Sequence, residues 1–152
     1  MNDRPQPPAG SFSGPRHWFA VRVYYEDTDL SGIVYHANYL KWFERARSDM
    51  LRLLGVDQRA AADAGEGFFT VADMAIRFAA PAKLDDAVLI ESHATEIGAA
   101  SVRLAQTAWR DDTMLAAATL RVGFITPDGR PRRQPAAWRQ AFQSVLFLKD
   151  SE

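Results

Sequence analysis

An acidic loop that leads through a glycine into a helix start is the part of this sequence best suited to chemistry. It runs from Tyr25 to Tyr39 with the sequence YEDTDLSGIVYHANY. A carboxylate such as Asp29 can attack an electrophile or remove a proton. The unpaired backbone N–H groups at the head of the following helix, with the positive end of its dipole, can hold a developing oxyanion. Both halves of an acyl-transfer site therefore lie within about ten residues.

A strand before the loop and a helix after it are needed to hold these groups. Residues 17–25 alternate between apolar and polar side chains, which predicts a strand that ends at the loop. Residues 37–54 predict a long helix, because apolar side chains recur at steps of four and three: Tyr39, Phe43, Ala46, Met50 and Leu53. Asn38 is expected to cap this helix, and Arg45 to pair with Asp49 on its exposed side.

The rest of the chain predicts a sheet that the long helix packs against. A short capped helix is expected over residues 57–64, followed by strands over residues 68–80, 87–97, 100–110 and 115–126. Short turns between these strands imply an antiparallel meander, and Pro135 opens a C-terminal helix. The expected fold is α+β, with a sheet of about five antiparallel strands wrapped around the long helix. Its uncovered edges predict a dimer with a continuous sheet.

The composition of the 152 residues is typical of one globular domain, expected to be cytoplasmic. The net charge of -1 gives no field to attract nucleic acid, and no apolar run is long enough for a transmembrane segment. The absence of cysteine excludes disulfides, thiolate zinc sites and a cysteine nucleophile. His17 and His93 stand alone in strand patterns, so no metal site is predicted. Residues 1–16 contain four prolines and are expected to be a disordered tail before a domain over residues 17–148.

Four motifs give the chain a family resemblance. They are YYEDTD at residues 24–29, GIVYHANY at 32–39, FERAR at 43–47 and PAKLDD at 81–86. Together they resemble the YbgC-type acyl-CoA thioesterases, the Tol–Pal-associated branch of the hydroxybenzoyl-CoA thioesterase superfamily, over residues 17–131. The resemblance implies a hotdog fold and hydrolysis of acyl-CoA without a cofactor. It also implies homodimers or homotetramers with acyl-CoA bound between subunits, and acyl carrier protein is a second candidate carrier of the thioester.

The resemblance also implies roles for individual residues. Asp29 occupies the position of the catalytic aspartate, and the backbone N–H of His36 that of the oxyanion donor. The residues between them are the predicted substrate contacts: Gly32, Ile33, Val34 and Tyr35. Hydroxybenzoyl-CoA thioesterases grip the CoA phosphates with an arginine-rich turn, whereas this chain has IGAAS at residues 97–101. Three arginines further along the chain are candidates to hold the phosphates instead, namely Arg130, Arg132 and Arg133.

The sequence leaves the chemical roles of several side chains open. Asp29 can act as a nucleophile or as a base that activates water, or it can simply bond nearby N–H groups in the loop. The His36 side chain need not act as an acid, because a thiolate with a parent pKa of about 8.5 is already a good leaving group. Asp27 is expected to order the loop. Glu44, a carboxylate on the predicted helix, is expected to contact Arg47 or an interface rather than to react.

Two other functions compete with thioester hydrolysis. A dehydratase of the same fold acting on hydroxyacyl thioesters also uses a histidine and a carboxylate, and it releases an enoyl product in place of free thiol. A non-catalytic acyl-CoA-binding or scaffold protein binds without turnover. The intact loop around Asp29 argues against the second alternative.

Overall fold

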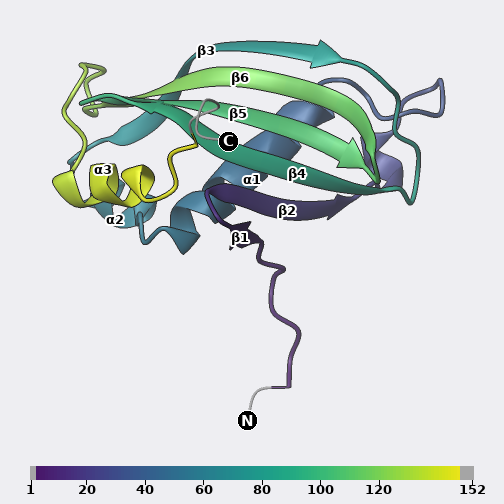
Figure 1. The fold of residues 1–152 in the computed structure, drawn as a ribbon, viewed down its shortest axis with the longest axis horizontal. Helices are drawn as coiled ribbons and strands as arrows, with labels where there is room; N and C mark the ends of the chain where they lie inside the picture. Colours follow the sequence, from purple (N-terminus) through teal and green to yellow (C-terminus); the bar gives the residue numbers. More distant parts are fainter. Residues whose placement is uncertain (1–2, 148–152) are drawn as a thin grey trace.

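A curved antiparallel sheet wraps around one long helix in the computed structural model, which describes residues 3–147 (Figure 1). The elements in chain order are β1 (Ser11–Ser13), β2 (Arg16–Arg22), the 3-10 helix η1 (Tyr25–Asp27), α1 (Asn38–Leu53), α2 (Gln58–Asp63), β3 (Phe68–Phe78), β4 (Ala87–Ile97), β5 (Ser101–Arg110), β6 (Thr113–Ile125) and α3 (Ala136–Gln143). This is the hotdog arrangement expected from the resemblance.

The sheet has six strands in the order β1-β2-β4-β5-β6-β3, one more than the approximate count expected. Strands β4, β5 and β6 form an antiparallel meander, as predicted. The prediction that β3 belongs to the same meander is wrong, because β3 pairs with β6 at the far edge and β4 pairs with β2. The connection over residues 79–86 is not a tight turn, and part of it lies beside the acidic loop, where Ile33 and Lys83 form an isolated antiparallel bridge.

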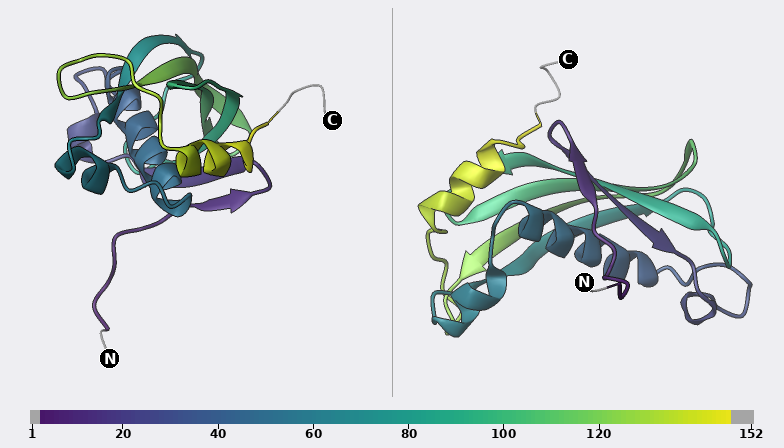
Figure 2. Two further views of the ribbon diagram at one scale, coloured as in Figure 1. Left: turned by 90° about the vertical axis from the view of Figure 1, so that its left-hand side faces the viewer. Right: turned by 90° about the horizontal axis from the view of Figure 1, so that it is seen from below.

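Helix α1 lies across the concave face of the sheet, as the two further views show (Figure 2). The predicted helix is confirmed to within one residue at each end. Four residues of its predicted apolar stripe are at most 3% exposed: Tyr39, Phe43, Ala46 and Met50. Leu53, the last residue of the stripe, is 44% exposed, so the stripe ends before the helix does. Burying these side chains supplies the main apolar contact between the helix and the sheet.

The remaining helices follow their sequence signals. The Asp57 side chain accepts a hydrogen bond from the Ala60 N–H at 2.9 Å, which confirms the predicted capped helix at α2. Pro135 precedes α3, as predicted, and Phe142 of α3 is buried against the aromatic ring of Phe69. None of the helices within residues 3–147 is long and apolar enough to cross a membrane.

The segment before the acidic loop differs from its prediction. Strand β2 ends at Arg22, three residues before the predicted end at Tyr25, and Tyr25 begins η1 instead. The reason is local, because the Asp27 carboxylate accepts a hydrogen bond from the Tyr24 N–H at 2.8 Å and bends the chain. Tyr25 is consequently exposed on this turn rather than paired in the sheet.

The expected disordered tail is wrong for residues 10–16. Gly14 and Pro15 form a turn that folds β1 back onto β2, with Ser13 opposite Arg16. The Gly10 N–H then donates to Asp49 Oδ2 on α1 at 3.0 Å, and a Cβ on Gly10 would stand 2.2 Å from the Trp18 carbonyl oxygen. The glycine-proline pair is a turn signal here, although proline content alone suggested disorder. Leu148, the predicted end of the domain, lies outside the described residues.

Asp49 faces the sheet, so the predicted exposed pair of Arg45 with Asp49 is wrong. Its Oδ2 lies 2.6 Å from Nε2 of the fully buried His17, which the sequence had suggested was isolated. Burial lowers the pKa of His17, against the opposing effect of the hydrogen bond to Asp49. The contact therefore joins a neutral imidazole on β2 to α1 and to the backbone of Gly10.

We predict that Asp49→Ala lowers the free energy of unfolding by about 2 to 4 kcal/mol, because it leaves the His17 ring and the Gly10 N–H without their buried acceptor. Denaturant unfolding measures this loss. Asp63→Ala is the control, since its exposed pair with Arg59 at 3.8 Å is worth little. Equal stability of the two variants would contradict a structural role for Asp49.

Candidate active site

The acidic loop is closed by its own backbone. The Asp29 N–H donates to the Ile33 carbonyl at 2.9 Å, and the Gly32 N–H donates to the Asp29 carbonyl at 3.0 Å. Gly32 has φ +84°, in the left-handed region that other residues adopt only with strain. The turn therefore depends on this glycine, and it holds Asp29 at a fixed place on the surface.

The Asp29 carboxylate is exposed and bonded to Ser31. Its Oδ1 accepts from the Ser31 N–H at 2.8 Å and also from the Ser31 hydroxyl. These bonds from the Ser31 side chain and backbone lower the pKa of Asp29 below its ordinary value, and the nearby His36 lowers it further. Asp29 is therefore ionised at neutral pH, and Ser31 binds one of its two oxygens.

Asp27 orders the loop, as expected. Its side chain accepts from the Tyr24 N–H, and its carbonyl accepts from the Tyr35 N–H at 2.9 Å. The Asn38 amide donates to the same carbonyl at 2.8 Å, so the predicted helix cap at Asn38 is wrong. Asn38 is instead the first residue of α1, and Ala37 precedes it without a side-chain cap.

The four predicted substrate contacts, residues 32–35, differ in their exposure to solvent. Ile33 pairs with Lys83, and the Val34 N–H donates to the Ala82 carbonyl at 2.9 Å, which fixes the loop to the segment before β4. Val34 is buried in the core, so its side chain is not open to a substrate. Gly32 and Tyr35 are exposed beside the catalytic candidates.

The head of α1 offers free hydrogen-bond donors. The helical turn begins with the Asn38 N–H, which donates to the Tyr35 carbonyl at 2.9 Å. Among the described residues, the backbone N–H groups of His36 and Ala37 donate to no acceptor. The dipole of a helix with 16 residues adds a positive potential at this end. This is the arrangement that stabilises an oxyanion.

The His36 ring packs between two aromatic rings, with centroid distances of 4.6 Å to Tyr35 and 5.8 Å to Phe78. Sequence reasoning missed Phe78 as a neighbour, because the contact joins the start of α1 to the end of β3. It also missed Ser31, although a serine two residues after an aspartate is a typical partner in an Asx turn.

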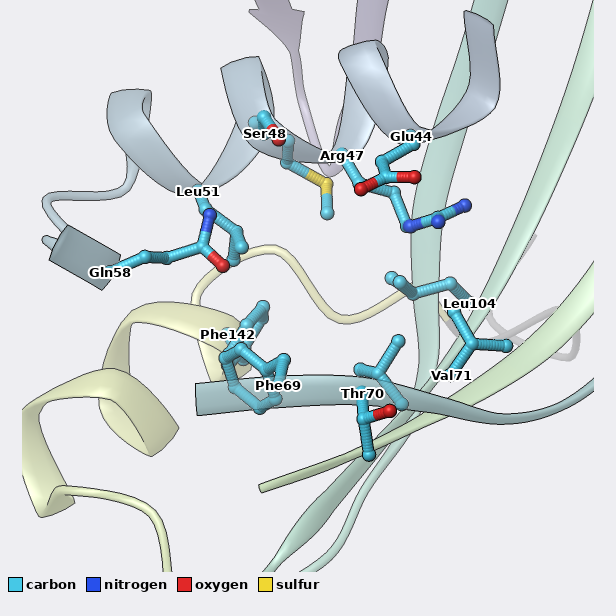
Figure 3. Close-up of a pocket in the computed structure, with 12 residues that line it drawn as sticks. Glu44, Arg47, Ser48, Leu51, Gln58, Phe69, Thr70, Val71, Leu104 and Phe142 are labelled. Carbon is cyan, nitrogen blue, oxygen red and sulfur yellow. The ribbon is translucent and has the colours of Figure 1, made fainter. Parts of the chain in front are cut away.

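A pocket of about 260 Å³ lies further along α1, in the gap between this helix and β3 (Figure 3). The helix contributes both polar and apolar side chains to it, and β3 contributes the opposite wall. Residues that line it include Glu44, Arg47, Ser48, Gln58, Thr70 and Val71. Its volume lies below the range of about 300–1,000 Å³ typical of drug-sized ligands.

Glu44 and Arg47 in this pocket form no ion pair within the described part of the chain, so the expected salt bridge is absent there. Glu44 is exposed, which leaves the interpretation of an interface contact. Arg47 is buried and donates to Gln106 Oε1 at 2.9 Å. Burial lowers the pKa of the Arg47 guanidinium, and the Glu44 charge opposes this effect.

The three arginines that are candidates to hold the CoA phosphates lie after β6. Arg130 pairs with Asp128 at 3.4 Å, and Arg132 donates to the Glu66 carbonyl at 2.7 Å, both in the segment between β6 and α3. Arg133 follows in the same exposed segment. No group of three or more His, Cys, Asp or Glu side chains in residues 3–147 is arranged to hold a metal ion.

Comparison with known proteins places this chain in one class. The family model of the Thioesterase superfamily matches residues 31–117. The chain is 40% identical to the acyl-CoA thioesterase YbgC of Haemophilus influenzae over 125 residues, 79% of this chain and 92% of that protein. It is 39% identical to the acyl-CoA thioester hydrolase YbgC of Escherichia coli over 117 residues, 76% and 87% of the two chains.

A solved structure agrees with these sequence relatives. The crystal structure of a probable thioesterase from Bartonella henselae superposes with a TM-score of 0.75 at 37% identity, and covers 79% of this chain and 99% of that one. The chain therefore belongs to the thioesterase superfamily. Within it, the YbgC proteins are relatives that match more than three quarters of this chain.

Proposed function

We propose that this chain hydrolyses acyl-CoA thioesters, with the Asp29 carboxylate as the nucleophile and the head of α1 as the oxyanion site. The observation that carries the proposal is the pair of free N–H groups at His36 and Ala37 a few residues after an ionised, fixed aspartate. The activity of the YbgC relatives, at about 40% identity, supports the choice of acyl-CoA as substrate.

The reaction proceeds by two displacements. The Asp29 carboxylate attacks the thioester carbonyl carbon, and the oxyanion accepts hydrogen bonds from the helix head. Collapse of this intermediate breaks the carbon–sulfur bond and releases the CoA thiolate, which leaves a mixed anhydride on Asp29. Water then hydrolyses the anhydride to the free acid and restores the carboxylate. The thiolate takes its proton from solvent, so no side-chain acid is required.

The lowered pKa of Asp29 argues against a role as a general base. A carboxylate whose pKa lies below its ordinary value is a weak base at neutral pH, whereas its negative charge remains available for attack. Ser31 also bonds to Oδ1, which orients the carboxylate. The dehydratase and binding-only alternatives have no support among the relatives at about 40% identity, whose names specify thioester hydrolysis.

We predict that Asp29→Asn abolishes thioester hydrolysis and leaves folding and acyl-CoA binding largely intact, because the amide keeps the shape and loses the charge. Thiol release measured across acyl-CoAs of increasing chain length tests this and also reports the preferred substrate. Asp27→Asn is the matched control: it replaces the charged acceptor of the Tyr24 N–H with a neutral amide oxygen and is expected to cost more in stability than in turnover. Retention of more than about a tenth of the activity by Asp29→Asn contradicts the nucleophile.

We also infer a homodimer that forms through β3. This strand is one edge of the sheet and has 11 residues, whereas β1 at the other edge has three. Its exposed apolar side chains, with exposed fractions of 41% to 46%, are Phe68, Val71 and Phe78. A long apolar edge strand of this kind is normally covered by another chain. A two-fold axis perpendicular to β3 pairs it antiparallel with its copy.

This dimer completes the active site. The His36 ring contacts Phe78 at the end of β3, whereas residues 69–71 near its start line the pocket beside α1. Antiparallel pairing of the two copies of β3 brings these ends together. The Asp29 and His36 groups of one protomer then face the pocket of the other, which is the proposed site for the acyl group.

We predict that two inactive variants restore activity when mixed. Asp29→Asn removes the nucleophile, and Ser48→Trp blocks the pocket that the other protomer uses. A mixed dimer retains one site with an intact Asp29 and an intact pocket, so random exchange should recover about a quarter of wild-type activity. Thiol release after subunit exchange measures this, with light scattering to confirm the dimer mass. No recovery despite exchange means that each site lies within a single chain.

The cytoplasmic location and an acyl carrier protein as an alternative thioester carrier remain proposals. The lack of cysteine is compatible with a reducing compartment. Assaying acyl groups on CoA and on acyl carrier protein side by side distinguishes the two carriers.

A further inference from the structure

Gln106 on β5 uses both ends of its buried side-chain amide to hold other elements. Its Nε2 donates to the Phe43 carbonyl on α1 at 2.9 Å and to Ser92 Oγ on β4 at 3.0 Å. Its Oε1 accepts from Arg47 Nη1, also on α1. Gln106 is 1% exposed, and it is the only hydrogen-bond partner of the Arg47 guanidinium among the described residues.

These bonds constrain α1 in a way that apolar packing does not. Contacts between apolar side chains are non-directional, so a helix can slide slightly on a sheet at little cost. A hydrogen bond weakens steeply when its distance or angle changes. Because Phe43 and Arg47 lie about one helical turn apart, Gln106 fixes both the rotation and the axial position of the helix.

The position of α1 sets the position of the oxyanion donors. His36 lies two residues before α1, and Phe43 lies in its second turn, so a shift of the stiff helix at Phe43 reaches the helix head. The acidic loop is also fixed to the segment before β4, by the Val34 N–H bond to the Ala82 carbonyl. A shift of α1 against the sheet therefore disturbs the alignment of the helix head with the loop.

We propose that Gln106 is a positioning residue for thioester hydrolysis, which holds the head of α1 in register with Asp29 through its bonds to Phe43 and Arg47. The inference rests on the oxyanion site proposed above. Gln106 does not line the pocket beside α1, so its effect on the reaction is transmitted through the helix rather than by contact with the acyl group.

The test is the Gln106→Glu variant. A glutamate keeps an acceptor for Arg47, but it loses the N–H donors to Phe43 and Ser92 and places a carboxylate oxygen against the Phe43 carbonyl. We expect kcat to fall about tenfold, since misplacement by about 1 Å costs up to ~100-fold, with KM changed less than about twofold. The backbone amide signals of His36 and Ala37 in a ¹H–¹⁵N spectrum should move in the same variant.

Two controls separate positioning from stability. Ser92→Ala removes only the bond from Gln106 to β4 and should keep wild-type kcat. Ile90→Ala, a fully buried position on β4 outside the pocket, should lower the melting temperature and keep kcat when assayed well below it. A folded Gln106→Glu variant with wild-type kcat overturns the proposal, as does an equal fall in kcat for Ile90→Ala.

A second variant covers the case in which Gln106→Glu does not fold. The double variant Arg47→Met with Gln106→Leu replaces the polar contact by apolar groups, an exchange that often preserves stability. Its kcat should also fall about tenfold, and a wild-type kcat overturns the proposal. The KM of this variant is not informative, because Arg47 lines the pocket. An active Gln106→Glu beside an inactive His36→Pro contradicts the role of Gln106 alone, whereas an active His36→Pro contradicts the oxyanion site itself.

Discussion

The burial of α1 in the concave face of the sheet is the constraint on which the rest of the structure depends. It removes the rings of Tyr39, Trp42 and Phe43 from water, and it fixes the end of the helix that directly follows the acidic loop. Two buried polar contacts add direction to this packing, one from Asp49 to β2 and one from Arg47 to β5. The helix is therefore both the core of the fold and the support of the site.

Much of this fold could be predicted from the sequence, because its signals are local and periodic. Steps of four and three marked α1, and alternation with short turns marked β4, β5 and β6. The place of β3 could not be predicted in the same way, since strand order depends on which edges remain free after the sheet assembles. The turn at Gly14 and Pro15 was missed because a count of prolines ignores the partner strand that a turn creates.

In the candidate site, too, local features could be predicted and long-range contacts could not. The loop motif predicted Asp29 and the helix head, because both lie within one continuous segment. The partners that tune them come from side-chain geometry: Ser31 lowers the pKa of Asp29, and Phe78 reaches His36 from a distant strand. His17 with Asp49 and Arg47 with Gln106 are also long-range pairs, which no spacing in a single sequence reveals. The sequence motif therefore predicts the reacting groups better than it predicts the side chains that position them.

The most direct test of the proposed mechanism compares His36→Pro with His36→Ala. Alanine keeps the backbone N–H at the head of α1 and removes only the imidazole. Proline removes the N–H as well, and helices accept proline at their start because no intrahelical hydrogen bond is lost there. With both variants folded by circular dichroism, kcat for acyl-CoA hydrolysis should be about 100-fold or more lower for proline than for alanine. Equal rates in the two variants would exclude the His36 N–H as an oxyanion donor and contradict the proposed mechanism.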